Sequence, residues 1–386
     1  MKSVCEINKC AGCMACVDVC TKNAIRVLDQ IKHYNAIIDE NKCVACGRCH
    51  RVCPNNEYPT MLEPTRWHQG WASNEEIRCV GSSGGVATAI SAAFVQNGGL
   101  VCSCVFEAGE FRFDIVDEVE GINRFSGSKY VKSNPAGVYK KLKKEIALNK
   151  SVLFIGLPCQ VAALKNYIGD NERLYTIDLI CHGTPSPKLL EMYLKENQHS
   201  IKMVTELRFR KKASFKLSDN YVGIKPSGVQ DRYTYAFLKS VCYTENCYAC
   251  RYAQQNRVSD ISLGDSWGSQ LSEEEKVKGI SLILCQSDKG QELLRMTDLH
   301  LEDVDLENAI AHNKQLNAPS KKPLEYDAFF DMMKKTGNFS RSVKKCYPKF
   351  CMHQDIKTLL LKAKILRGGT TIEYAVYIAV HMDDKK

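Results

Sequence analysis

One cysteine pattern occurs twice near the start of the chain, and it limits what this region can fold into. In each run the spacing is Cys-x-x-Cys-x-x-Cys-x-x-x-Cys, and the second run begins 33 residues after the first. The two runs consist of Cys10, Cys13, Cys16 and Cys20, and of Cys43, Cys46, Cys49 and Cys53. A 4Fe–4S cubane takes four thiolates, and three of them can come from one short loop. The repeat therefore predicts a small unit that holds two such clusters.

The fourth cysteine of each run is expected to serve the other cluster, as it does in two-cluster ferredoxins. The predicted ligand sets are Cys10, Cys13 and Cys16 with Cys53, and Cys43, Cys46 and Cys49 with Cys20. A zinc module or a disulfide framework is the alternative, but zinc sites usually combine two separated cysteine pairs, often with histidine. Proline usually follows the fourth cysteine, and Pro54 does so, whereas Thr21 stands after Cys20. Because this proline shapes the turn and is not a ligand, the exchange leaves the prediction intact.

Length and charge exclude some classes of function. With 386 residues the chain can form two or three domains with a buried core. The formal net charge is +9, but the basic residues are spread in small groups without interleaved aromatic residues, so we expect no nucleic-acid partner. No apolar run reaches the ~18 residues of a membrane span, and the first residues lack the apolar core of a signal peptide. We expect a cytoplasmic protein, since clustered cysteines in a reducing compartment usually bind metal.

The organisation along the chain predicts an α+β or α/β protein in three parts. We expect a two-cluster ferredoxin domain over residues 1–58, a mixed α/β body over 60–300 and a helical extension over 301–386. The expected helices of the body are 85–96, 135–148 and 158–167, with one more after Pro187; the expected strands are 100–106, 151–155, 174–180, 206–210, 261–263 and 280–286. Helix-like stretches in the extension are 329–335 and 356–366.

A Ser/Gly loop opens directly into the first helix of the body. Its residues are Gly81, Ser82, Ser83, Gly84 and Gly85. Backbone amides at a helix N-terminus can approach an anion closely when the loop is made of small residues, so the loop is a candidate seat for a cofactor diphosphate. An ordinary helix cap is the alternative. The loop is neither a Walker A loop nor Gly-x-Gly-x-x-Gly, so it does not indicate an ordinary nucleotide-binding fold.

Four cysteines of the body form a further candidate set. Cys159 and Cys181 each follow a predicted strand, where α/β folds bring ligands beyond the carboxyl ends of the sheet. Cys247 and Cys250 form a Cys-x-x-Cys pair in a polar loop. These four could hold a third cubane, a zinc ion or nothing. His182 could be a proton donor, although a histidine beside a glycine turn can equally be structural.

Several short motifs occur in an order that resembles one family. They are Ser82-Ser83-Gly84-Gly85, Leu157-Pro158-Cys159-Gln160, Asp178-Leu179-Ile180-Cys181-His182-Gly183, Cys247-x-x-Cys250 and Asp260-Ile261-Ser262-Leu263-Gly264-Asp265. Over residues 1–290 the chain resembles the beta subunit of coenzyme F-420-reducing hydrogenase and dehydrogenase, in the form with a fused ferredoxin domain. The tail beyond residue 300 adds nothing to the resemblance.

The resemblance implies a flavin, FAD, held by the Ser/Gly loop and by the segment Ser126, Gly127, Ser128, Lys129 and Tyr130. It also implies a cluster near the flavin, for which Cys159, Cys181, Cys247 and Cys250 are the matching candidates. The expected function is an iron–sulfur flavoprotein oxidoreductase that exchanges electrons with a redox partner, a ferredoxin or reductase subunit, and hydride with an organic substrate or a deazaflavin. The alternatives are an electron-transfer subunit without its own substrate, an accessory protein of polysaccharide biosynthesis, and a cluster protein that has lost its flavin.

Overall fold

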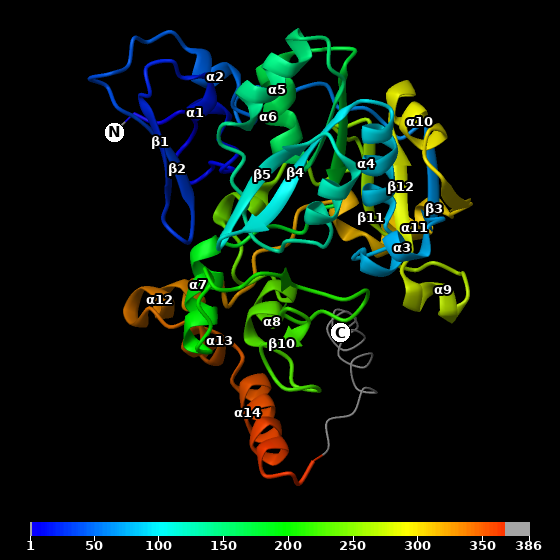
Figure 1. Cartoon of the computed structure of the whole chain (residues 1–386). Helices are drawn as coiled ribbons and strands as arrows, with labels where there is room; N and C mark the ends of the chain where they lie inside the picture. Colours follow the sequence, from blue (N-terminus) through cyan, green and yellow to red (C-terminus); the bar gives the residue numbers. More distant parts are fainter. Residues whose placement is uncertain (1, 367–386) are drawn as a thin grey trace.

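The computed structural model describes residues 2–366, and its N-terminal part is a small unit around a hairpin (Figure 1). Strands β1 (Ile25–Asp29) and β2 (Tyr34–Ile38) pair antiparallel. One cysteine loop with a short helix precedes β1, and a second cysteine loop with a short helix follows β2. These helices are α1 (Ala15–Val19) and α2 (Arg48–Arg51). Helix α1 contacts α5 and α6 of the body, so the unit is docked against the body.

The body is built on one sheet of eight strands in the order β13-β3-β12-β11-β7-β6-β4-β5. The four central strands run parallel: β4 (Leu100–Glu107), β6 (Val152–Gly156), β7 (Leu174–Leu179) and β11 (Ile261–Asp265). The outer strands pair antiparallel: β5 (Glu110–Val116) beside β4, then β12 (Ser281–Cys285), β3 (Arg66–Ala72) and β13 (Leu299–Glu302) on the other side. The parallel order places four strand ends along one edge of the sheet.

Alternate residues of the central strands pack into two different cores. In β6, Val152 and Phe154 belong to the core that also contains the buried cysteines of the N-terminal unit, whereas Leu153 and Ile155 face the core on the opposite side. Helices α5 (Val138–Ala147) and α6 (Pro158–Ile168) contact β6 on the first side, and α4 (Val86–Gln96) and α10 (Asp288–Arg295) contact each other on the second. The sheet is thus covered on both faces, as parallel strands require.

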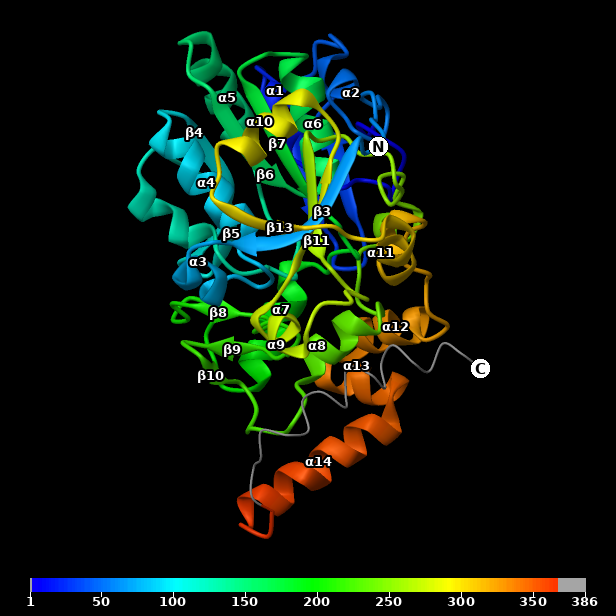
Figure 2. The same ribbon diagram turned by 90° about the vertical axis from the view of Figure 1, so that its right-hand side faces the viewer.

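A second lobe lies beyond the carboxyl edge of the parallel strands (Figure 2). Its helices pack around a core rich in aromatic side chains. The lobe contains α7 (Pro187–Glu196), β8 (Leu207–Arg208), β9 (Ser218–Asp219), β10 (Val222–Gly223), α8 (Arg232–Leu238), α12 (Tyr326–Thr336), α13 (Phe339–Cys346) and α14 (Pro348–Lys362). The other helices are α3 (Glu75–Val80), α9 (Glu273–Lys278), α11 (Leu306–His312) and the 3-10 turns η1 (Val119–Phe125), η2 (Glu245–Ala249) and η3 (Lys314–Leu316).

The expected mixed α/β fold with parallel pairing and a helical C-terminal region is confirmed. The strand expected over 206–210 is only Leu207–Arg208, and the last helix begins earlier than expected because Pro348 starts it at the first helical position. Lys364, with φ of +57°, lies two residues beyond its end. In the described part of the chain no helix has the length and apolarity that crossing a bilayer requires.

Candidate functional site

The two cysteine runs of the N-terminal unit have matching backbones. Gly12 and Ala45 are equivalent positions with φ of +70° and +55°, and Met14 and Gly47 are equivalent with +62° and +71°. In each run the amide two residues after the first cysteine donates to that cysteine's sulfur, at 3.4 Å in both cases. Helices α1 and α2 then begin at equivalent residues. The repeated sequence therefore forms repeated loops that present their sulfurs in the same way.

The two sets of thiols differ in burial. Burial raises the pKa of the Cys13 and Cys16 thiols, and negative charge on Cys53 raises it further. Cys53 therefore lies among the first set. Burial also raises the pKa of Cys49, and charge on Cys43 and Cys20 raises it further. Cys10, Cys13, Cys16 and Cys53 are buried, whereas Cys20, Cys43 and Cys49 are half-buried and Cys46 is exposed. The first set faces the body, and the second lies at the surface.

A ninth cysteine accompanies the buried set. Hydrogen bonding from the Cys5 thiol lowers the pKa of Cys53 to about 7, and the same interaction lowers the pKa of Cys10. Cys5 is itself buried. This contact could not be predicted from the spacing, since Cys5 lies outside both runs.

The fold brings the four body cysteines to the wall of one cavity of about 440 Å³. Cys159 is the second residue of α6, Cys181 follows β7, and Cys247 lies in η2 with Cys250 directly after it. Burial raises the pKa of the Cys159 thiol to about 12 and raises that of Cys181 further, and each of these thiols is also affected by charge on Cys247 and Cys250. The set is therefore close enough for mutual electrostatic influence.

The four body thiols are a candidate donor set. Among residues 2–366, no group of three or more His, Cys, Asp or Glu side chains is arranged to hold a single metal ion. Four cysteine thiolates are the ligands that a 4Fe–4S cubane takes, and all-cysteine zinc sites use the same donors. The chemistry of the body set therefore fits a 4Fe–4S cubane.

A larger cavity of about 1270 Å³ lies at the carboxyl edge of the parallel strands. All four parallel strands contribute to its wall, through Cys104 within β4, Leu157 after β6, Ile180 after β7 and Asp265 at the end of β11. The second lobe forms the opposite wall with side chains such as Phe237. Ligands of α/β folds bind at this edge of the sheet.

The Ser/Gly loop borders this cavity and is tied to its surroundings by several hydrogen bonds. The amide of Ser128 donates to Ser82 Oγ at 2.8 Å, which joins the loop to the 126–130 segment. Lys212 Nζ donates to the carbonyls of Gly81 and Ser83 at 2.9 and 2.8 Å, and Ser83 Oγ donates to the Ile280 carbonyl at 2.8 Å. The hydroxyl of Ser83 is thus already used within the protein.

The N-terminus of α4 opens into the same cavity. Its N-cap, Gly85, has φ of +80° and offers no side chain to cap the helix, and Val86, Ala87 and Thr88 of its first turn line the cavity. Uncapped amides at a helix start attract negative charge. Gly84 does not line the cavity; a Cβ there would collide with the carbonyl of Gly70 in β3, so its small size serves packing.

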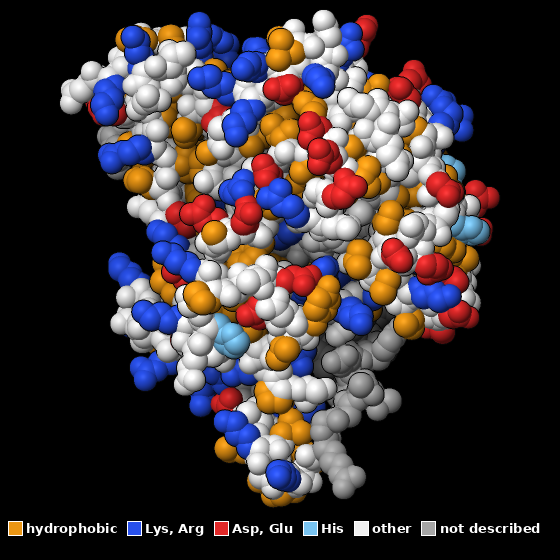
Figure 3. Space-filling model, in the orientation of Figure 1, with side chains coloured by type: hydrophobic (Ala, Val, Ile, Leu, Met, Phe, Trp, Pro, Cys, Tyr) orange, Lys and Arg blue, Asp and Glu red, His pale blue; other side chains and the backbone are white. Residues whose placement is uncertain are grey.

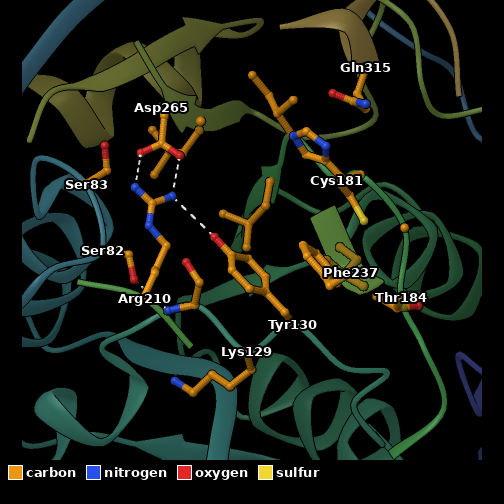
Figure 4. A pocket seen from close by; sticks show the side chains of 18 of the residues that line it. Ser82, Ser83, Lys129, Tyr130, Cys181, Thr184, Arg210, Phe237, Asp265 and Gln315 are labelled. Carbon is orange, nitrogen blue, oxygen red and sulfur yellow. Dashed lines mark hydrogen bonds and ion pairs between the residues drawn. The ribbon is translucent and has the colours of Figure 1, made fainter. Parts of the chain in front are cut away.

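Figure 4 shows the polar and aromatic groups inside the cavity. Arg210 forms a two-pronged ion pair with Asp265, at 2.6 and 3.0 Å, and donates to Tyr130 Oη at 3.2 Å. The Tyr130 ring stacks on Phe237 with a centroid distance of 4.4 Å. Lys129 Nζ donates to the carbonyls of residues 125 and 126, and burial lowers its pKa to about 8. A flat, ring-bearing ligand with an anionic part would find suitable partners here.

The segment Cys181–Thr184 separates the two cavities and lines both of them. Its backbone is held from the C-terminal side, where Ser320 Oγ donates to the His182 carbonyl at 2.6 Å. Gly183 has φ of +131°, and a Cβ there would collide with the Tyr243 ring. His182 therefore lies at the boundary between the cysteine cavity and the larger cavity.

Sequence reasoning missed several groups of this site. Arg210 and Phe237 come from the second lobe, and residues 311–325 add a C-terminal wall to the larger cavity. Lys132, which lies just after the 126–130 segment, lines the cysteine cavity. The available signal for Arg210 was its place in a small basic group, which is also typical of exposed surface segments.

Family models match most of the chain. The model described as coenzyme F420 hydrogenase/dehydrogenase, beta subunit N-term, matches residues 67–138, and the model for the C terminus of that subunit matches residues 149–307. A 4Fe-4S dicluster domain model matches residues 9–56. No curated protein matches the sequence significantly.

One similar solved chain belongs to a structure titled as a xenon derivatization of the F420-reducing NiFe hydrogenase complex from Methanosarcina barkeri. It is 17% identical, with a TM-score of 0.46. The match covers 69% of this chain and 99% of that chain.

Proposed function

The chain belongs to the coenzyme F420 hydrogenase/dehydrogenase beta subunit family and carries a 4Fe-4S dicluster domain, and we propose that it is an iron–sulfur flavoprotein oxidoreductase. It would pass electrons between its clusters and a flavin that exchanges hydride with an organic substrate or a deazaflavin. The observation that carries the proposal is the Cys181–Thr184 segment, which lines both the cysteine cavity and the larger cavity. A cluster site and a cofactor site would thus share one wall.

Three groups of thiols would hold iron. In the dicluster domain the buried set with Cys53 would hold the first cluster, and the surface set with Cys20 the second. Cys159, Cys181, Cys247 and Cys250 would hold a third cluster in the body. Their four-thiolate donor set, on the wall of one cavity, supports a cubane. Burial raises the pKa of Tyr252, and charge on Cys159 and on Cys13 raises it further. One residue is thus close to a thiol of each set, so the body cluster would lie next to the first cluster.

FAD is the proposed occupant of the larger cavity. Its diphosphate would lie at the uncapped start of α4, beside Ser82 and Ser128, where amides and the helix dipole favour an anion. Lys129 would contribute positive charge next to this position, and Gly85 would leave it open. A bound flavin converts between one-electron and hydride transfer. Tyr130 and Phe237 would bound its ring system and keep water out.

The protein groups around the ring would orient a substrate rather than react with it covalently. His182 reaches the larger cavity at its boundary with the body cysteines and would supply or accept a proton there. Arg210 is held rigidly by Asp265 and Tyr130, so it can fix an anionic or carbonyl group without moving. The volume of about 1270 Å³ favours an enzyme with its own substrate over a pure electron relay.

Electrons would enter or leave at the surface set of the dicluster domain. Cys46 is exposed, and the Lys42 side chain beside it is 61% exposed. Lys and Arg side chains gather over this part of the molecule in Figure 3. A redox partner, a ferredoxin or reductase subunit, could approach this face. The many free thiols fit the cytoplasm, which we propose as the location.

Anaerobic purification with iron, sulfide and flavin analysis tests the proposal. We expect about twelve irons and as many labile sulfides per chain, together with bound FAD. Cys250→Ala should lose about four irons and keep the dicluster signals, whereas the matched control Cys346→Ala, a thiol outside all three sets, should keep all of them.

Three outcomes would contradict it. A folded protein with zinc and no labile sulfide would show that the proposed clusters do not exist. A folded protein with about eight irons would show that the body holds no cluster. A cluster-bearing protein that neither contains nor binds flavin would end the flavoprotein proposal. Turnover of organic substrates or deazaflavin with dithionite as reductant then separates an enzyme from a relay.

A further inference from the structure

Lys132 connects the dicluster domain with the body at the cysteine cavity. Its backbone amide donates to the Pro185 carbonyl at 2.9 Å, just after the Cys181–Thr184 segment. Its Nζ donates to the Ala11 carbonyl at 3.0 Å, in the loop between Cys10 and Cys13. The residue is only 6% exposed. The side chain therefore runs from the wall of the body cysteine cavity to the loop of the buried cysteine set.

The path of this side chain is narrow and leaves it little freedom. A Cβ on Gly12 would lie 2.9 Å from Lys132 Cδ and 3.2 Å from the Tyr34 ring. The ammonium lies 5.3 Å from the centre of the same ring. Gly12 and Tyr34 thus lie against the side chain, and the Ala11 carbonyl accepts a hydrogen bond from its charged end.

No carboxylate among residues 2–366 forms an ion pair with Lys132. A buried ammonium is costly unless an anion offsets it, and the anions available on its two sides are thiolates. Lys132 Nζ donates to the Ala11 carbonyl directly after Cys10, and the residue lines the same cavity as Cys159. One buried cation therefore lies beside the loop of the first set and at the cavity of the body set.

We propose that Lys132 supplies a fixed positive charge between the first cluster of the dicluster domain and the body cluster, and that it raises the reduction potentials of both. A cluster held by four thiolates is anionic, and each one-electron reduction adds negative charge, so a nearby cation stabilises the reduced form. The part that concerns the body cluster rests on the proposed function. The second cluster would be held mainly by the other loop, whereas Lys132 contacts the loop of Cys10 and Cys13, so the second cluster should not respond.

Redox titration followed by electron paramagnetic resonance tests this on the purified full-length protein. Lys132→Gln removes the charge and leaves a neutral polar amide, one bond shorter than the lysine side chain, beside the Ala11 loop. We expect the equilibrium constant for reduction of the first and body clusters to fall at least tenfold, which corresponds to a midpoint about 59 mV lower for one electron. Lys132→Arg should keep the wild-type values. Lys144→Gln, which removes an exposed lysine of α5, is the matched control and should change nothing.

The outcomes separate this inference from the proposed function. If Lys132→Gln keeps its iron and the first cluster keeps its midpoint, or if Lys132→Arg shifts it as far as Lys132→Gln does, the inference is wrong. Lys132→Met provides a second neutral variant should Lys132→Gln not retain its clusters. Wild-type protein with about eight irons would refute the body cluster, while the shift of the first cluster would still test Lys132. A shift of the second cluster alone would also overturn the inference.

Discussion

The dicluster domain and the body cysteines differ in how the chain assembles a set of thiols. In the domain, three sulfurs of each set come from one short loop, and the two loops repeat the same backbone angles. In the body, four sulfurs come from three places between residues 159 and 250: two follow parallel strands, two come from the 3-10 turn η2 and its end, and all four line one cavity. The first arrangement depends on local conformation, whereas the second depends on the integrity of the whole sheet. Changes in the two regions should therefore have different consequences.

The strongest test of this contrast is removal of a single thiol from each half of the dicluster domain. Cys53→Ala and Cys46→Ala should each abolish one cluster and remove about four irons per chain. Cys53→Ala should also lower the thermal unfolding midpoint more, because Cys53 is buried in the core shared with the body while Cys46 is exposed. Iron analysis and thermal unfolding measure the two effects. Equal losses of stability would show that burial of the first set does not support the body.

A second test targets the support of the body set. Arg257 and Asp178 form a fully buried ion pair with an N–O distance of 2.6 Å. Arg257 also donates to the carbonyl of Tyr252, which lies two residues after Cys250. Arg257→Ala would leave the Asp178 carboxylate buried without its partner, which costs about 3–5 kcal/mol of unfolding free energy. Urea unfolding should detect this loss.

The control for that measurement is Lys278→Ala, which breaks an exposed pair with Glu274. It should leave the unfolding free energy almost unchanged, because water screens an exposed pair. Arg257→Ala should also lose the four irons of the body cluster and keep the dicluster signals. Loss of all clusters together would mean that the two regions do not fold independently.

A third test acts on the segment between the cavities. Gly183→Ala places a Cβ against the Tyr243 ring at a φ of +131°, so it should destabilise the fold by about 1–3 kcal/mol. It should displace Cys181 and reduce the iron of the body set. Gly137→Ala is the control: Gly137 has φ of +83°, and no atom lies within 4 Å of the Cβ that the substitution adds. It therefore measures the effect of backbone strain without a side-chain collision. If both variants keep full iron, the position of this segment does not govern the body cluster.

The smallest effect should come from pH. Burial lowers the pKa of Lys129 to about 8, and partial burial lowers that of Lys212 to about 8. These amines lose their protons above about pH 8 in the folded protein but keep them to about pH 10.4 in the unfolded chain. Their burial cost is therefore full below about pH 8 and declines as pH rises from about 8 to about 10.4.

The affinity for FAD should fall over the same rise in pH, since the cavity loses positive charge. Fluorescence titration of flavin-free protein with FAD between pH 7 and 9.5 measures this. Lys129→Met should weaken binding at pH 7 and flatten the profile. A steeper profile in Lys129→Met would contradict a role for its charge.

The parts of the fold that could be predicted are those with a strong local signal. Strand β6 is buried along its whole length, so its apolar run was visible, and Pro158 and Pro187 mark the starts of two helices. Strand β3 begins with two exposed residues and mixes polar with apolar side chains, so it has no clear period in the sequence. Its place in the sheet depends on pairing with β12 and β13, more than two hundred residues away.

The candidate site shows the same division. The loop over 81–85 and the body cysteines could be identified as motifs, yet only the fold brings them to two adjoining cavities. Arg210 belongs to a small basic group that resembles a solvated surface, but it is buried and paired with Asp265. Cys5 and Lys132 act through contacts across the chain, for which single residues give no pattern.

The Cys181–Thr184 segment has a consequence for how the two cavities communicate. Since one short stretch of backbone forms part of both walls, a molecule that moves it from one side also moves a thiol on the other. Thermodynamic linkage then requires reciprocity: if ligand binding changes the tendency of the body cluster to accept an electron by some factor, reduction changes the affinity for that ligand by the same factor. Such a chain would hold its ligand with a strength that depends on whether an electron has already arrived.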